Sequence, residues 1–191
     1  MKYLSNQLLD ELYDQTEKNI VKAITEWQQL SSYQLPAQPA TGQWSALQCL
    51  EHLNSYGRYY LPAITSAISM GSTKQPSLYF KSSLLGNYFY KLMLPQQDGK
   101  LKKKMKSPKD HQPATQLDAA VVLSEFISQQ ELLGQLLIKI RSIDINKVRV
   151  PISIAPFIKL KLGDTLLFFV AHIQRHSSQA ERALASARNN I

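Results

Sequence analysis

Hydrophobic residues recur every three or four positions along four long stretches of the chain, with polar residues between them. The four stretches are residues 5–30, 45–69, 115–141 and 164–188. An apolar stripe with this period is typical of an amphipathic helix that buries one face. Four helices of about 25 residues each predict an all-α fold, and within that class a four-helix bundle.

Residues near the ends of these stretches agree with this interpretation. Ser45 and Gln48 have the spacing of a capping box at the start of the second helix. Asp164 is the expected N-cap of the last helix, and Thr115 and Asp118 are expected in the first turn of the third. Each of these three helices therefore has a predicted starting point.

The connection between the second and third helices, residues 71–113, is unusually long for a helical bundle. Its length predicts a crossover or a functional insertion. A short helix is expected at residues 82–94, stopped by Pro95. Residues 146–164 contain two prolines, and we predict irregular structure there. Their alternation in polarity would also fit an extended segment, but we do not predict a sheet from it.

Composition supports a folded protein. Hydrophobic residues make up 44% of the 191 positions, which predicts a single domain over residues 1–191. Cys49 is the one cysteine, so no internal disulfide can form, which is typical of a reducing compartment. No apolar run approaches the roughly 18 residues of a membrane span. Asp10 and Glu11 stand where a signal peptide needs an apolar centre, so we expect a cytoplasmic location.

The net charge of +8 arises mainly from one short segment, residues 100–109. This lysine loop comprises Lys100, Lys102, Lys103, Lys104, Lys106 and Lys109. Without it the net charge would be +2. A run of this kind is usually a solvated loop and less often an anion contact. No aromatic residue is interleaved with the lysines, so we do not expect nucleic acid as a partner.

Two of the four histidines lie on the apolar stripe of the last helix. That stripe consists of Thr165, Phe168, Phe169, His172, His176, Gln179 and Ala183. Both imidazoles should therefore point into the core or into a cavity at the end of the bundle. Arg175, Ser178 and Arg182 fall outside the stripe. Inward histidines are most often ordinary core residues, but a pair four residues apart can also chelate a metal ion.

His52 occupies the inward stripe of the second helix, together with Tyr56. If the second and fourth helices are neighbours, three imidazoles can meet and leave coordination positions open, as in a catalytic metal site. Tyr56 could donate a hydrogen bond to a substrate or simply pack in the core. His111 lies in a polar loop and is interpreted as a surface residue, and Cys49 as a buried, inert thiol.

Two segments resemble the DinB-like (YfiT-type) family of bacterial four-helix bundles. They are "WSALQCLEHL" at residues 44–53 and "GDTLLFFVAHIQRHSSQAER" at 163–182, with "KMKSPKDHQP" at 104–113 as a third, weaker match. The resemblance covers nearly the whole chain. It implies a DinB-like bundle that binds a divalent metal ion and that often forms a homodimer. Three imidazoles suit zinc, and we expect Zn or Ni, with iron, cobalt and manganese as alternatives.

The resemblance also assigns roles to individual residues. It implies that His52, His172 and His176 are the metal ligands, and that Gln179 lies behind them or on the substrate side. The family often has a glutamate at the position of Gln48, so an acid–base role there is in doubt.

Two classes of function remain open on this evidence. The resemblance implies a metal-dependent transferase that uses a low-molecular-weight thiol, or a hydrolase, in either case with a small-molecule substrate. No general base stands out among the matched residues, which favours the thiol, and no catalytic residue is assigned. The alternative is a non-catalytic, metal-stabilised bundle that acts in a stress response or as a weak nucleic-acid-binding module.

Overall fold

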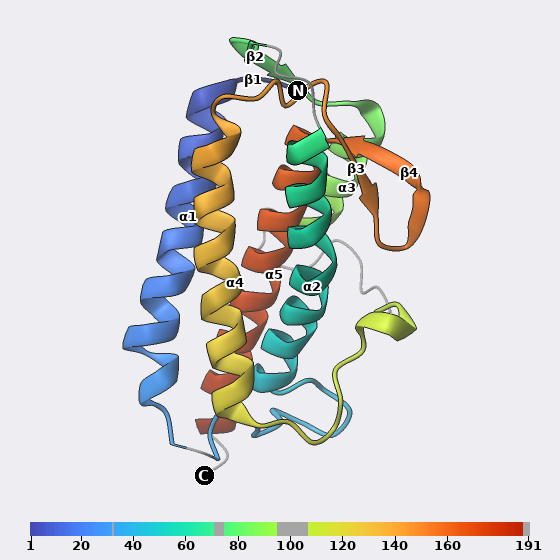
Figure 1. Cartoon of the computed structure of the whole chain (residues 1–191). Helices are drawn as coiled ribbons and strands as arrows, with labels where there is room; N and C mark the ends of the chain where they lie inside the picture. Colours follow the sequence, from blue (N-terminus) through green and yellow to red (C-terminus); the bar gives the residue numbers. More distant parts are fainter. Residues whose placement is uncertain (32, 71–74, 95–106, 189–191) are drawn as a thin grey trace.

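The structure is a computed structural model that describes residues 1–31, 33–70, 75–94 and 107–188 (Figure 1). Its four long helices are α1 (Ser5–Thr25), α2 (Ala46–Met70), α4 (Ala119–Ile140) and α5 (Leu162–Arg188). Helix α1 packs against α4, α4 against α2, and α2 against α5, which also contacts α1. This closed arrangement confirms the predicted helical bundle. A short 3₁₀ turn, η1 (Trp27–Gln29), follows α1.

The length of the connection after α2 follows from the directions of the helices. Helices α2 and α4 run the same way, so the chain must return along the whole bundle between them (Figure 1). The described part of this crossover contains β2 (Tyr79–Lys81), α3 (Leu84–Met93) and the 3₁₀ turn η2 (Lys109–His111). The short helix predicted at residues 82–94 is therefore present as α3, and it packs against α5.

Two helices begin elsewhere than the sequence predicted. Helix α5 begins at Leu162, so the prediction of Asp164 as its N-cap is wrong. The buried carboxylate of Asp164 instead accepts hydrogen bonds from the hydroxyls of Ser82 and Ser83 at 2.6 and 2.7 Å, and so fixes α3 to α5. Helix α4 begins at Ala119, and Asp118 is its N-cap and not a first-turn residue. Thr115 lies outside the helix.

The start of α2 agrees with the sequence. The amide of Gln48 donates to the Ser45 hydroxyl, and the amide of Ser45 donates to the Gln48 side-chain oxygen, both at 3.1 Å. This reciprocal capping box satisfies amides that the first turn would otherwise leave without acceptors. It also fixes the register of α2 two turns before His52.

The prediction of irregular structure at residues 146–164 is wrong, because β3 (Arg149–Ile152) and β4 (Ala155–Lys161) form an antiparallel hairpin. Val148, Val150 and Ile152 alternate into the core, which is the ordinary burial pattern of a strand. Pro151 is tolerated because β3 and β4 form a sheet of two strands, in which each has an open edge. A second strand pair joins β1 (Lys2–Leu4) to β2 near the N-terminus.

Large side chains fill the centre of the bundle. Trp27 packs against Phe126 with ring centroids 5.7 Å apart, and Leu50, Leu137 and Phe169 are almost completely buried. No helix in the described part of the chain has the length and apolar content needed to cross a membrane.

Candidate metal centre

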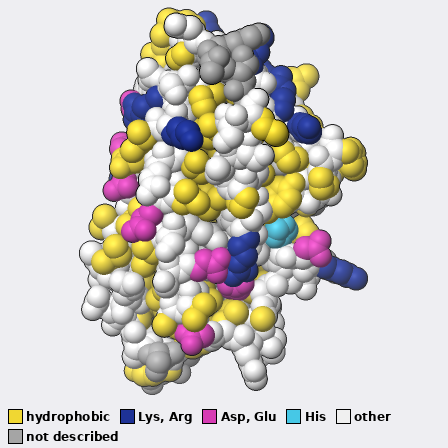
Figure 2. Space-filling model, viewed as in Figure 1, with side chains coloured by type: hydrophobic (Ala, Val, Ile, Leu, Met, Phe, Trp, Pro, Cys, Tyr) yellow, Lys and Arg dark blue, Asp and Glu magenta, His cyan; other side chains and the backbone are white. Residues whose placement is uncertain are grey.

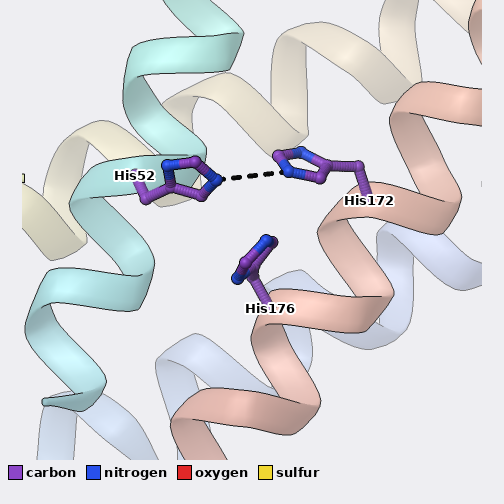
Figure 3. A group of neighbouring side chains, drawn as sticks. All are labelled: His52, His172 and His176. Carbon is purple, nitrogen blue, oxygen red and sulfur yellow. Dashed lines mark hydrogen bonds between the residues drawn. The ribbon is translucent and has the colours of Figure 1, made fainter. Parts of the chain in front are cut away.

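Three imidazoles from two neighbouring helices meet at one point beside the core. His52 comes from α2, and His172 and His176 come from α5 (Figure 3). The Nε2 atoms of His52 and His172 are 3.2 Å apart, and one nitrogen from each of the three rings lies within 4.8 Å of the others. The cluster could therefore hold a metal ion.

Hydrogen bonds behind the rings orient two of them for this role. Nδ1 of His52 lies 2.7 Å from the backbone oxygen of His111, and because a carbonyl only accepts, Nδ1 carries the proton. Nδ1 of His176 donates in the same way to Oε1 of Gln179 at 3.0 Å. In both rings Nε2 keeps its lone pair, and histidine ligands in proteins are commonly held by contacts of this kind.

One nitrogen of His172 is buried without a hydrogen bond. Among the residues that the structure describes, its Nδ1 atom has no hydrogen-bond partner, and the ring stacks on that of Phe168 with centroids 5.8 Å apart. Whether the proton sits on Nδ1 or on Nε2, one buried nitrogen of this ring stays unsatisfied, which is costly. A cation beside the Nε2 atoms of His52 and His172 would leave Nδ1 of His172 as it is, but it would bind the two lone pairs that otherwise meet when that Nδ1 carries the proton. The convergence of the three rings, more than the Nδ1 atom, is therefore what fits a metal ion.

Burial keeps the three imidazoles neutral. It lowers the pKa of His52 to about 4 and that of His176 to about 3, and it holds the pKa of His172 well below its usual range. The positive charges that neighbouring histidines would carry act in the same direction. Since only a neutral imidazole can bind a metal ion, all three rings are ready as ligands at neutral pH.

The histidines form part of the wall of a cavity of about 980 Å³. Tyr56 and Gln179, the other two residues singled out in the sequence, line the same cavity. Tyr60, Phe89 and Phe168 supply an aromatic wall. The face displayed in Figure 2 shows only a small patch of histidine surface. His172 is 4% exposed. The volume is that of a small-molecule site.

Two cavity residues were missed in the sequence. Arg175 and Arg182 were placed outside the inward stripe of the last helix, but both line the cavity. Nη1 of Arg175 donates to the backbone oxygen of Leu92 at 3.0 Å. The cavity covers a wider arc of α5 than one apolar stripe does. Their spacing in the sequence could have indicated this. Arg175 lies three residues after His172, and Arg182 lies three residues after Gln179, so each is a neighbour of a stripe residue on the helix surface.

The interpretation of His111 as a surface residue is wrong, because its side chain is only 7% exposed. The turn η2 packs on α2 and brings the ring against Tyr56, with centroids 3.9 Å apart. Nδ1 of His111 also lies 3.0 Å from the hydroxyl of Ser55. Nothing in the polar sequence around His111 indicates this, since its burial depends on how the crossover folds back.

The remaining candidates lie outside the cluster. Cys49 is fully buried, as predicted, and burial raises the pKa of its thiol to about 12, so it stays protonated. The side chain of Gln48 serves the capping box. Of the lysine loop, Lys109 is exposed at η2, while Lys100, Lys102, Lys103, Lys104 and Lys106 lie outside the described residues.

Comparison with known proteins gives one result. Neither the curated proteins nor the solved structures gave a match to this chain. The sequence profile of the DinB superfamily matches residues 12–180, a range that includes all three histidines of the cluster. With most of the chain matched and a helical bundle in agreement, the protein belongs to the DinB superfamily.

Proposed function

We propose that this protein is a metal-dependent transferase that joins a low-molecular-weight thiol to a small electrophilic molecule. The observation that carries the proposal is the position of the three neutral imidazoles in the wall of a cavity of about 980 Å³. A structural zinc site is closed by four protein ligands, whereas three ligands that face a cavity leave room for a reactant.

His52, His172 and His176 would hold the ion, which in this proposal is Zn or Ni. When bound, such an ion supplies Lewis-acid stabilisation of negative charge on sulfur or oxygen. The hydrogen bonds from His52 to the His111 carbonyl and from His176 to Gln179 keep two rings in the tautomer that the site needs.

Tyr56 and Gln179 would bind the substrate. Burial raises the pKa of Tyr56 to about 12, so its hydroxyl remains a donor at neutral pH. Its ring packs against His172 with centroids 4.3 Å apart, which places it beside the cluster. Gln179 uses its side-chain oxygen for His176 and keeps its NH₂ group for a ligand.

A thiol fits this cavity better than a water nucleophile does. None of the described residues that line the cavity is an aspartate or a glutamate, so no carboxylate is at hand to deprotonate water. A thiol is far more acidic than water and can lose its proton to solvent once its anion is stabilised. In the proposed reaction the sulfur forms a bond to carbon while the leaving group departs with its electron pair.

The test is a conjugation assay on untagged protein whose metal content has been measured. Cysteine, glutathione and other small thiols are each offered to monochlorobimane, which releases chloride when the sulfur adds. We expect near-equimolar metal in the wild type and acceleration by at least one thiol. His172→Ala should lose both, while Lys139→Gln, an exposed change on α4, should lose neither.

The other functions correspond to distinct outcomes of the same assay. Thiol-independent cleavage of nitrophenyl esters that requires His172 would identify a hydrolase. Equimolar metal without any turnover would identify a non-catalytic bundle. Wild-type protein without metal would overturn the proposal at its first step.

A further inference from the structure

The turn η2, yellow-green in Figure 1, packs against α2 and carries the backbone oxygen that accepts from His52. It also carries the side chain of His111, for which the proposed reaction has no use. That side chain is only 7% exposed, although it belongs to a polar segment of the crossover. Because burial removes the imidazole from water, contacts with the protein have to replace its hydration. The residues on either side of the turn that line the cavity are Ser107, Pro108, Gln112 and Pro113.

Two contacts hold the His111 ring on α2. The ring lies against that of Tyr56 with centroids 3.9 Å apart, and its Nδ1 atom lies 3.0 Å from the Ser55 hydroxyl. The single proton of that hydroxyl is donated to the backbone oxygen of His52 at 2.8 Å. Ser55 therefore accepts from Nδ1 of His111, which fixes the tautomer of this ring. These contacts join the crossover to the turn of α2 that follows His52.

The backbone of His111 holds the His52 ring in its turn. Its oxygen accepts from Nδ1 of His52 at 2.7 Å, and the Ser107 hydroxyl lies 3.0 Å from the same oxygen. The η2 element is a single 3₁₀ turn of three residues. So short a segment is ordered by its packing more than by its own hydrogen bonds. The position of the oxygen therefore depends on the contacts of the His111 side chain.

We infer that His111 is a positioning residue for the metal site, because its side chain anchors the crossover to α2 and so holds the carbonyl that orients His52. The turn and a bound metal ion then stabilise each other. A carbonyl that fixes the His52 ring favours metal binding, and an ion that fixes the ring favours the docked turn by the same factor. The inference rests on the metal site of the proposed function and not on its reaction.

The test measures zinc affinity by competition with a chelator, on untagged full-length protein that has first been stripped of metal. His111→Ala keeps the backbone oxygen but removes the anchor, so it should weaken zinc binding about tenfold. His111→Asn can place an amide NH₂ group close to the position of Nδ1, where it can again donate to Ser55. It should therefore restore most of the affinity.

Ser55→Ala removes the other half of the same contact. It should weaken zinc binding as well, and combining it with His111→Ala should cause little further loss, because both changes remove one interaction. Asn19→Ala is the control for a general loss of stability. Its side chain is buried beside α1 and bonds to Gln130 and Gln174, away from the turn, so zinc affinity should match that of the wild type.

Hydrogen exchange measures the reciprocal effect on the wild type, and so does not depend on whether His111→Ala folds. Zinc added to the metal-free protein should slow exchange of the amides in residues 109–112 about tenfold, the factor by which His111→Ala weakens zinc binding. The β3–β4 hairpin is an internal control. The amide of Ser153 in it donates to the Tyr60 hydroxyl, two turns of α2 beyond His52, so exchange there should change little.

Three results would overturn the inference. These are a zinc affinity of His111→Ala within about twofold of the wild type, an equal loss of affinity in Asn19→Ala, or exchange at residues 109–112 that zinc does not change. Thiol conjugation by a protein whose zinc affinity does not depend on His111 would refute the inference and leave the proposed function standing. Coupling between zinc and the turn without any conjugation would do the reverse.

Discussion

Buried polar side chains occur on both sides of the bundle, but their hydrogen bonding differs between the two sides. Beside α1, the amide of Asn19 donates to Oε1 of Gln130 on α4 at 3.3 Å and accepts from Gln174 on α5 at 3.4 Å. The hydroxyl of Thr16 donates to the Leu12 carbonyl at 2.9 Å. Between α2 and α5, by contrast, Nδ1 of His172 is buried and has no hydrogen-bond partner among the residues that the structure describes. The Asn19 side chain is bonded through both its NH₂ group and its oxygen, whereas one nitrogen of His172 is not bonded.

This difference separates structural polarity from polarity that serves a ligand. A network such as that of Asn19, in which side chains of three helices bond to one another, stabilises one packing of the helices. In the histidine cluster the Nε2 atoms of His52 and His172 lie 3.2 Å apart, and all three rings line a cavity. Nitrogen atoms that converge beside a cavity are thus better evidence for a ligand than burial or polarity alone.

The largest expected effect is loss of metal from the histidine cluster. His172→Ala removes the ligand whose Nε2 lies 3.2 Å from that of His52 and leaves two imidazoles, which make a weak site. Elemental analysis of untagged protein should show near-equimolar metal in the wild type and less than about a tenth of that in the variant. The helical circular dichroism spectrum should persist. Full metal content in His172→Ala would show that these histidines are core residues like Asn19.

The second largest effect is a dependence of stability on pH that the Asn19 network should not share. The histidines of the unfolded chain titrate near pH 6.5, whereas burial lowers the pKa of His52 to about 4 and that of His176 to about 3. The unfolded state therefore takes up protons first as the pH falls. The free energy of unfolding should be level above pH 6.5 and decline steadily below it.

Urea denaturation at several values between pH 7.5 and 4.5 measures this decline, and metal content can be followed in the same samples. Replacing His176 with alanine should make the profile shallower. The Asn19 network carries no titrating group. Asn19→Ala should therefore lower the free energy of unfolding by the same amount at every pH and leave its dependence on pH unchanged. A wild-type profile that stays level down to pH 4.5 would contradict the prediction.

The histidine positions could be read from the sequence because they depend on helical period, which is a local property. His52, His172 and His176 lie on apolar stripes, and the structure brings the three together because α2 and α5 are neighbours. His111 could not be read in this way, since it is buried by a crossover that folds back onto α2. Arg175 was missed for another reason: one stripe was taken as the whole lining of α5.

The difference between local patterns and contacts with distant parts of the chain also explains which parts of the fold were predicted wrongly. The capping box of Ser45 and Gln48 involves residues three apart and was predicted correctly. Asp164 was misassigned because its partners, Ser82 and Ser83, are about eighty residues away in the chain. The β3–β4 hairpin was rejected because of its prolines, although the structure accommodates Pro151 in a two-stranded sheet.

A moderate loss of stability is expected from breaking the Asn19 network. Asn19→Ala deprives Gln130 and Gln174 of a partner, and a buried group left without one costs about 2 kcal/mol. Urea denaturation should show this loss, while metal content stays equimolar because no ligand is touched. The variant thus mirrors His172→Ala, which should lose metal and keep its fold. Loss of metal in Asn19→Ala would mean that the two sides of the bundle are coupled.

The smallest expected effect concerns the cap that fixes the start of α2. Ser45→Ala removes the hydroxyl that accepts from the Gln48 amide at 3.1 Å, and loss of such a cap costs about 1 kcal/mol. Ser124→Ala, an exposed change on α4, is the matched control and should leave the urea midpoint unchanged. His52 lies two turns further along α2, where its Nδ1 is held separately by the His111 carbonyl. Zinc affinity, measured by competition with a chelator, should therefore change by less than about threefold. A larger loss of affinity would show that the cap positions His52, and that the metal cluster depends on the same local order as the rest of the bundle.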